Sequence, residues 1–300
     1  MKSPTICRDR FSEVSNDRCA PGDTPVRPQR AAVFGHAEFA LQGDSTRVVS
    51  LGSRAPLQLL APRAGSDVGW LVMGSLGGGL LGGDHIKVDL HVQQGAGAYV
   101  TTQASTKIFK SGGCGAVRQS LDALIAPDAS MLLAPDPVVC FAQSDYQQEQ
   151  KFYLHAGSSL LAVDWFTSGR WQCGERWNFA RYISRQSVYV NGDPILLDAL
   201  ELDNTVSHIS RTVGFNVVNA LATVICLGPR FAGAALALLQ RLHNTPIQTK
   251  DSVMFGISEL ADGFLLRVGG DSAENVGRFL QKELVSAAAA MGVELWQRKW

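Results

Sequence analysis

The segment Gly77-Gly78-Gly79-Leu80-Leu81-Gly82-Gly83-Asp84, which runs directly into Ile86-Lys87-Val88-Asp89-Leu90-His91-Val92, decides the fold class of this chain. Gly77, Gly79 and Gly82 satisfy the G-x-G-x-x-G pattern, which holds a dinucleotide only where a strand turns into a helix. Residues 86–92 instead alternate strictly between apolar and polar side chains, which is the period of a half-buried strand. Thr102 also stands where an acidic ribose partner is expected, about twenty residues beyond the last glycine of the pattern. The glycines therefore lead into a sheet, and an NAD-binding enzyme is a disfavoured alternative.

The sequence around this segment, from residue 33 to residue 210, consists of short apolar runs separated by turn signals. Asn191-Gly192 supplies the positive backbone angles of a tight turn, so a hairpin is expected between residues 187–190 and 195–197. Further turns are expected at 95–97, 111–113, 135–137 and 168–169. This spacing predicts a mostly β fold, with one multi-strand β domain.

The C-terminal third has a different period, which predicts two helices. The first begins after Pro229, and its apolar face consists of Phe231, Ala235, Leu238, Leu239 and Leu242. In the second, Asp271 and Glu274 have the spacing of a capping box and Gly292 is the stop. Its apolar stripe is Val276, Phe279, Leu280, Leu284, Ala287 and Met291, and strands are expected on either side at 263–268 and 293–297.

Composition limits the classes of function. The 300 residues are 46% hydrophobic, enough for a large core, and we expect one domain over residues 31–300 behind a flexible tail of residues 1–30. The formal net charge is zero and the basic residues are dispersed, which disfavours nucleic acid and anionic membrane surfaces as partners. No apolar run is long enough to span a membrane, and the six cysteines form no C-x-x-C pair. We expect a soluble cytoplasmic protein with reduced thiols.

The sequence lacks two familiar catalytic motifs and a local metal site. No serine stands in a G-x-S-x-G elbow, and no glycine is followed by Lys and a hydroxyl residue as in a phosphate-binding loop. His85 and His91 share a strand face but are separated by about 20 Å at ~3.3 Å per residue, too far for one metal ion. The sequence therefore predicts that the chain does not itself hydrolyse GTP or ATP.

Acidic residues inside apolar strands are the remaining candidates for a functional role. Asp164 and Asp198 each interrupt such a strand, and a buried carboxylate requires a partner. For Asp164 the alternatives are a hydrogen-bonded side chain at a strand end, an ion pair with an arginine such as Arg170, or a place in a water-lined passage. Asp198 poses the same question. For Asp84 the alternatives are a turn-capping side chain or the same passage.

Two threonines and one glutamate pose a similar choice. Thr101 and Thr102 are either packing residues of a strand or part of a polar lining. Glu175, between Gly174 and Arg176, is either a turn residue with a local ion pair or part of that lining. Lys107 and Lys110 are expected on a solvated or partner-facing surface.

Two motifs together carry a family resemblance: Gly78-Gly79-Leu80-Leu81-Gly82-Gly83-Asp84, and Thr101-Thr102-Gln103-Ala104-Ser105-Thr106-Lys107-Ile108-Phe109-Lys110-Ser111. In order and spacing they resemble the urease accessory protein UreD family, called UreH in some bacteria. Further matches are Pro135-Asp136-Pro137-Val138, Leu161-Ala162-Val163-Asp164 with Gly169-Arg170, and Gly174-Glu175-Arg176. The resemblance covers residues 33–300.

The resemblance implies a layered, helicoid-like β fold with two helices. It also implies a protein that is not an enzyme but a scaffold in nickel insertion into apo-urease. It implies binding to apo-urease and to UreF, a dimeric complex with UreF, and contact through UreF with the GTP-hydrolysing nickel carrier UreG. It also implies that no cofactor is bound stably and that Ni²⁺ passes through a polar internal channel. By motif position the lining would include Asp84, Thr101, Thr102, Asp164 and Asp198, with Glu175 as a further candidate.

Spaced carboxylates and hydroxyls suit such a channel, because a conduit must bind its ion weakly enough to release it. A β-rich protein-binding module unrelated to nickel is the alternative that remains open.

Overall fold

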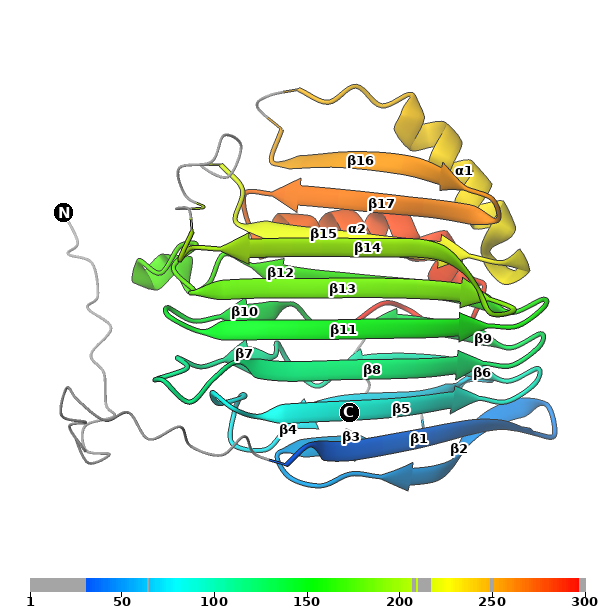
Figure 1. Cartoon of the computed structure of the whole chain (residues 1–300). Coiled ribbons are helices and arrows are strands. Elements are labelled where there is room, and N and C mark those ends of the chain that lie inside the picture. The colour runs from blue at the N-terminus through cyan, green and yellow to red at the C-terminus, as the bar shows by residue number, and fades with distance from the viewer. Residues whose placement is uncertain (1–30, 64, 207–208, 210–216, 249–250, 297–300) are drawn as a thin grey trace, which may run out of the picture.

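Two β-sheets face each other in the computed structural model, and the chain coils between them (Figure 1). The model describes residues 31–63, 65–206, 209, 217–248 and 251–296. The expected tail of residues 1–30 lies outside these ranges. The mostly β fold and the two C-terminal helices are confirmed.

The seven-stranded sheet, hereafter the front sheet, has the order β14-β13-β11-β8-β5-β1-β2. Its strands are β1 (Val33–Gln42), β2 (Ser45–Gly52), β5 (His85–Val92), β8 (Val117–Ile125), β11 (Asp145–Leu154), β13 (Arg181–Val190) and β14 (Asp193–Asp203). The second, hereafter the back sheet, has the order β16-β17-β15-β12-β9-β6-β4-β3; β10 also pairs with β12, and β7 pairs with β10. Its strands are β3 (Leu57–Leu60), β4 (Gly69–Ser75), β6 (Gly97–Thr102), β7 (Lys107–Ile108), β9 (Ser130–Ala134), β10 (Val138–Cys140), β12 (Ser159–Thr167), β15 (Ala220–Leu227), β16 (Val253–Leu260) and β17 (Gly263–Gly270).

From β4 to β13 the chain alternates between the sheets, so that each turn of the coil adds one parallel strand to each sheet. In Figure 1 the front-sheet strands β5, β8, β11 and β13 point the same way. Short connections therefore lie at one end of the coil, and longer ones at the other, which we call the loop end. The loop end carries residues 76–84, 103–116, 135–144 and 168–180.

The strand predicted after the glycines is β5, and Ile86, Val88, Leu90 and Val92 are all buried. A dinucleotide site requires a helix at this point, so the NAD-binding alternative is wrong. The predicted hairpin joins β13 to β14, and Asn191 and Gly192 both have positive φ, 52° and 94°.

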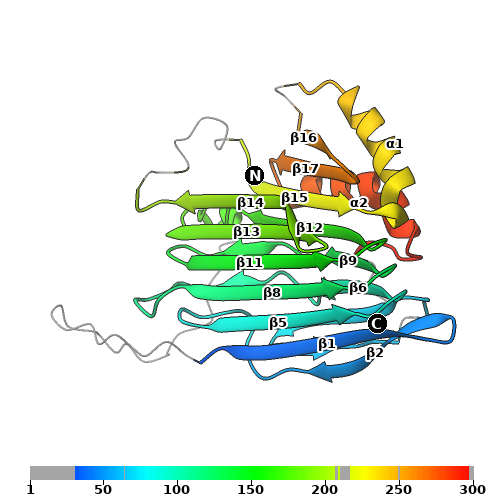
Figure 2. The same cartoon turned by 45° about the vertical axis from the view of Figure 1, so that its right-hand side comes forward.

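Two helices cover the outer face of the back sheet (Figure 2). α1 (Ala232–His243) follows a 3-10 turn at Pro229–Phe231, and α2 is Ala273–Ala289. The capping prediction was wrong by one residue: Ser272 is the N-cap and accepts a hydrogen bond from the Asn275 amide. The Asp271 carboxylate accepts instead from Asn275 Nδ2. None of the described residues forms a helix long and apolar enough to cross a membrane.

The strand predicted at 263–268 is present within β17, whereas the one at 293–297 is not formed by its described residues, 293–296. Trp296 explains this, because its amide donates to the Tyr99 hydroxyl and its indole Nε1 to the Pro135 carbonyl. These bonds hold the segment across the back sheet, in place of the backbone hydrogen bonds that a strand would form.

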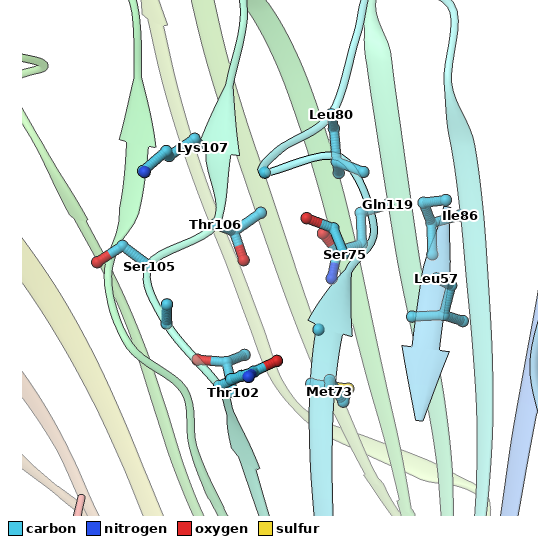
Figure 3. Close-up of a pocket in the computed structure, with 14 residues that line it drawn as sticks. Leu57, Met73, Ser75, Leu80, Ile86, Thr102, Ser105, Thr106, Lys107 and Gln119 are labelled. Carbon is cyan, nitrogen blue, oxygen red and sulfur yellow. The ribbon is translucent and has the colours of Figure 1, made fainter. Parts of the chain in front are cut away.

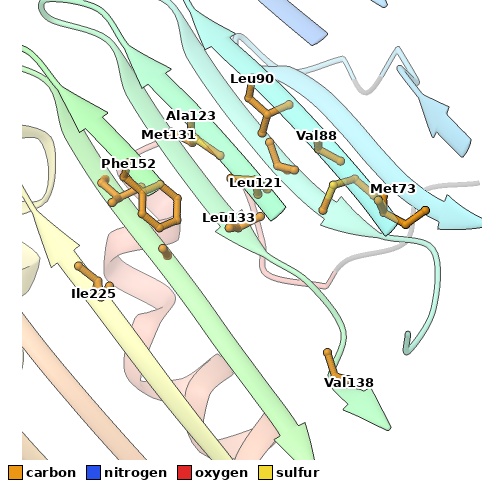
Figure 4. Packing of buried hydrophobic residues seen from close by; sticks show 14 of the residues in the cluster. Met73, Val88, Leu90, Leu121, Ala123, Met131, Leu133, Val138, Phe152 and Ile225 are labelled. Carbon is orange, nitrogen blue, oxygen red and sulfur yellow. The ribbon is translucent and has the colours of Figure 1, made fainter. Parts of the chain in front are cut away.

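The core has two layers. One lies between the sheets and includes Val88, Leu121, Leu133 and Phe152 (Figure 4). The other lies between the back sheet and the helices, with Trp165, Leu238 and Leu280 among its members. Because side chains alternate along β12, Asp164 faces the first layer and Trp165 the second.

Candidate functional site

The two sequence motifs form one contact at the loop end. The Leu80 amide donates to the Lys107 carbonyl at 2.8 Å, and the Phe109 amide donates to the Leu80 carbonyl at 2.9 Å. A Cβ on Gly79 would lie 2.6 Å from the Lys107 oxygen and 2.6 Å from Phe109 Cε2. A Cβ on Gly82 would lie 2.5 Å from the Ser111 oxygen. These glycines therefore permit close approach of two backbones, not the binding of a phosphate.

A pocket of about 160 Å³ opens beside this contact (Figure 3). Ser75, Leu80, Thr102, Thr106 and Gln119 are among the residues that line it. Met73, Thr102, Thr106 and Gln119 also line a smaller interior cavity of about 30 Å³, so the two spaces adjoin. The smaller cavity reaches Tyr146, Gln148 and Gln150 of β11, between the two sheets.

A chain of hydrogen bonds continues from that cavity to Asp164. The Tyr146 hydroxyl lies 3.0 Å from Gln119 Oε1 and 3.1 Å from Gln148 Oε1. Gln148 Nε2 donates to Ser184 Oγ at 2.9 Å, and Ser184 Oγ donates to Asp164 Oδ2 at 2.8 Å. In the register of β8, β11 and β13, Gln119 and Ser184 lie on either side of Gln148. These polar side chains therefore form a continuous row across the three strands.

Asp164 is 8% exposed and lies in the middle of β12. Its hydrogen-bond partners among the described residues are Gln148, Ser184 and Gln186, and none is an arginine. Burial raises the pKa of its carboxyl group, and hydrogen bonds from Gln148, Ser184 and Gln186 partly oppose that shift. Burial likewise raises the pKa of the Tyr146 and Tyr182 hydroxyls well above their usual value. Of the alternatives for Asp164, the ion pair with Arg170 is not formed, since the carboxylate is hydrogen-bonded to Ser184 and Arg170 pairs with Glu175.

Asp198 lies where the polar row reaches the open edge of the two sheets. It stands opposite Gln186 in the front sheet and forms an ion pair with Arg267 of the back sheet. Its negative charge contributes to the raised pKa of Asp164. Thr102 lines the pocket beside Gln119, where the row begins, and its hydroxyl donates to Asp136 Oδ2. Asp164 and Asp198 lie toward the other end of the row, at this edge.

Three candidates lie elsewhere. Thr101 points to the opposite face of β6 from Thr102, and its hydroxyl donates to the Ala134 carbonyl. Asp84 is buried at the loop end, where it accepts from the Leu81 amide as a turn-capping side chain does. Glu175 accepts from the Ala142 amide and pairs with Arg170, which lowers the pKa of its carboxyl group.

The sequence interpretation missed the amide and hydroxyl side chains of the row. A signal existed in β11, where Tyr146, Gln148, Gln150, Phe152 and Leu154 share one strand face. Two glutamines between apolar residues of the same parity indicate a polar interior. Gln150 Oε1 is buried and accepts no hydrogen bond from the described residues.

The oxygens of Asp164, Ser184 and the glutamines in this row are of the kind that can coordinate a divalent cation. Within the described ranges, no three His, Cys, Asp or Glu side chains are arranged to hold a metal ion.

Comparison with known proteins agrees with the motifs. Residues 33–299 match the family model described as UreD urease accessory protein. A urease accessory protein UreD from Anaeromyxobacter sp. is 38% identical over 88% of either chain. One from Sorangium cellulosum is 37% identical over 100% of this chain and 95% of its own. Urease accessory protein D of Arabidopsis thaliana is 31% identical over 83% of this chain and 95% of its own.

Proposed function

This chain belongs to the UreD family of urease accessory proteins, and from that premise we propose that it is a non-catalytic scaffold for nickel insertion. It binds apo-urease and UreF, in a dimeric complex with UreF, and through UreF it meets the GTPase UreG. Ni²⁺ crosses its polar interior as cargo and is delivered to the urease active site. The cytoplasm, where apo-urease folds, is the compartment we propose.

The observation that carries this proposal is the continuous polar row between the sheets. It begins at the pocket with Thr102 and Gln119, passes Gln148 and Ser184, and reaches Asp164. A purely structural interior would bury apolar side chains at these positions, because burial of polar groups is costly. The unpartnered Gln150 Oε1 supports the same interpretation, since a buried oxygen without a donor is available as a ligand.

The raised pKa of Asp164 fits a cargo role. A carboxyl group that is reluctant to ionise in a dry site releases its proton when a cation arrives and regains one when the cation leaves. Oxygen ligands bind Ni²⁺ less tightly than a cluster of imidazoles or thiolates would, which favours release.

Co-expression with UreF and the apo-urease subunits tests the proposal. Pull-down through a tag on this chain measures the partners, and metal analysis of the recovered urease measures nickel. We expect joint recovery and nickel loading that depends on this chain. A folded chain that recovers neither partner would contradict the scaffold role and favour a β-rich binding module unrelated to nickel.

A further inference from the structure

The mouth of the pocket carries positive charge and apolar side chains on its outer rim. Lys107 and Lys110 are exposed, and within the described part of the chain neither ammonium group forms an ion pair. Leu76 and Leu81, each next in sequence to a residue that lines the pocket, Ser75 and Leu80, are 50% and 48% exposed. Arg170 of the neighbouring loop stacks over the Phe141 ring and is already paired with Glu175.

The rim is held in place before any partner arrives. Ile108, between the two lysines, is fully buried, and Phe109 packs edge-on against Phe141 with ring centroids 5.1 Å apart. Leu80 is bonded to the Lys107 and Phe109 backbones. In Figure 3 the Lys107 side chain points away from Ser75 and Leu80, out of the pocket. Binding through this rim would therefore cost little backbone conformational entropy, because the backbone is already ordered.

We propose that this rim, residues 76–81 and 105–110, docks a protein partner through an acidic surface with an apolar centre. Carboxylates of the partner pair with Lys107 and Lys110, and its apolar side chains cover Leu76 and Leu81. The inference rests on the proposed function, in which Ni²⁺ enters at this mouth. The two ammonium groups repel the cation until carboxylates of a partner neutralise their charge.

The chemistry favours protein over other anionic partners. Nucleic acid and anionic lipid surfaces are bound by extended basic patches, whereas this chain has a net charge of zero. Two lysines beside two exposed leucines match the polar rim and apolar core of a protein interface.

The test is a charge reversal, Lys107→Glu with Lys110→Glu, in the full chain co-expressed with UreF and apo-urease. The matched control is Arg185→Glu, on an exposed residue of β13 away from the loop end. Circular dichroism and the thermal midpoint establish that each variant is folded. A second variant, Leu81→Ser, tests the apolar contribution without altering charge.

We expect the double variant to lose at least about tenfold in capture of one of the two partners, equivalent to ~1.4 kcal/mol, and the control to stay within about twofold. Leu81→Ser should weaken capture of the same partner. Undiminished capture of both partners by the folded double variant would overturn the docking surface while the scaffold role stands. Lysine-dependent binding to phosphatidylglycerol vesicles, with partner capture unchanged, would assign the rim to lipid. If the wild-type chain captures neither partner, both proposals fall.

Discussion

Replacement of Gly79 by alanine tests the conclusion that the double-glycine motif exists for close approach of two loops. The new Cβ would lie 2.6 Å from the Lys107 carbonyl oxygen and 2.6 Å from Phe109 Cε2, well inside the ordinary contact distance of 3.4 to 4 Å. Phe109 can shift its ring, but the Lys107 oxygen is backbone and accepts the Leu80 hydrogen bond at 2.8 Å. The loops must therefore separate and strain that bond.

Overpacking of this kind costs about 1–3 kcal/mol, and loss of one hydrogen bond adds about 1 kcal/mol. We expect Gly79→Ala to lower the free energy of unfolding by about 2 kcal/mol or more, measured by urea denaturation with circular dichroism. Gly233→Ala is the matched control, because a Cβ at this position in α1 meets nothing within 4 Å. It should be neutral or stabilise the protein by up to about 1 kcal/mol. Equal stabilities for Gly79→Ala and the wild type would refute the close-approach explanation.

Two further predictions concern a helix cap and a buried acid. Ser272→Ala removes the N-cap acceptor of α2 and should cost about 1 kcal/mol in the same denaturation assay; an unchanged midpoint would mean that Ser272 is not the effective cap. The pKa of Asp164 is higher in the folded state than in the unfolded state. Between these two pKa values the folded chain binds more protons than the unfolded chain, so the stability of the wild type falls as pH rises from the unfolded pKa to the folded pKa. Asp164→Asn lacks this penalty, so its thermal midpoint relative to the wild type should increase as pH rises from about 4, the unfolded pKa, and then level off. A difference that does not vary with pH, or that decreases, would contradict the burial-driven shift.

Local patterns in the sequence predicted much of the fold. The alternation of residues 86–92 gave β5, Asn191-Gly192 gave the β13–β14 hairpin, and the apolar stripe of residues 276–291 gave α2. Each of these features depends on neighbours within a few residues. The error in the N-cap of α2 is also local and amounts to one residue, since Asp271 and Ser272 are adjacent and both have oxygen acceptors.

Features that depend on distant pairing were not accessible in this way. Asp164 was recognised as unusual, but its partner Ser184 belongs to the other sheet and is brought to it by the coil. Arg170 was a plausible partner by proximity in sequence, yet the chain turns after β12 and directs Arg170 to Glu175. Likewise, a single sequence does not reveal that Gly79 lies against Lys107, nearly thirty positions away in the chain.

The most direct test of the central claim, that Ni²⁺ crosses the polar interior, is the nickel content of urease matured with Asp164→Leu. Leucine has a similar size but lacks the carboxylate at the end of the hydrogen-bonded row. Asp89→Leu, on the exposed outer face of β5, is the control. The claim predicts that both variants recover UreF and apo-urease as the wild type does, and that urease from the Asp164→Leu complex alone is depleted of nickel. Full nickel loading with Asp164→Leu would contradict it.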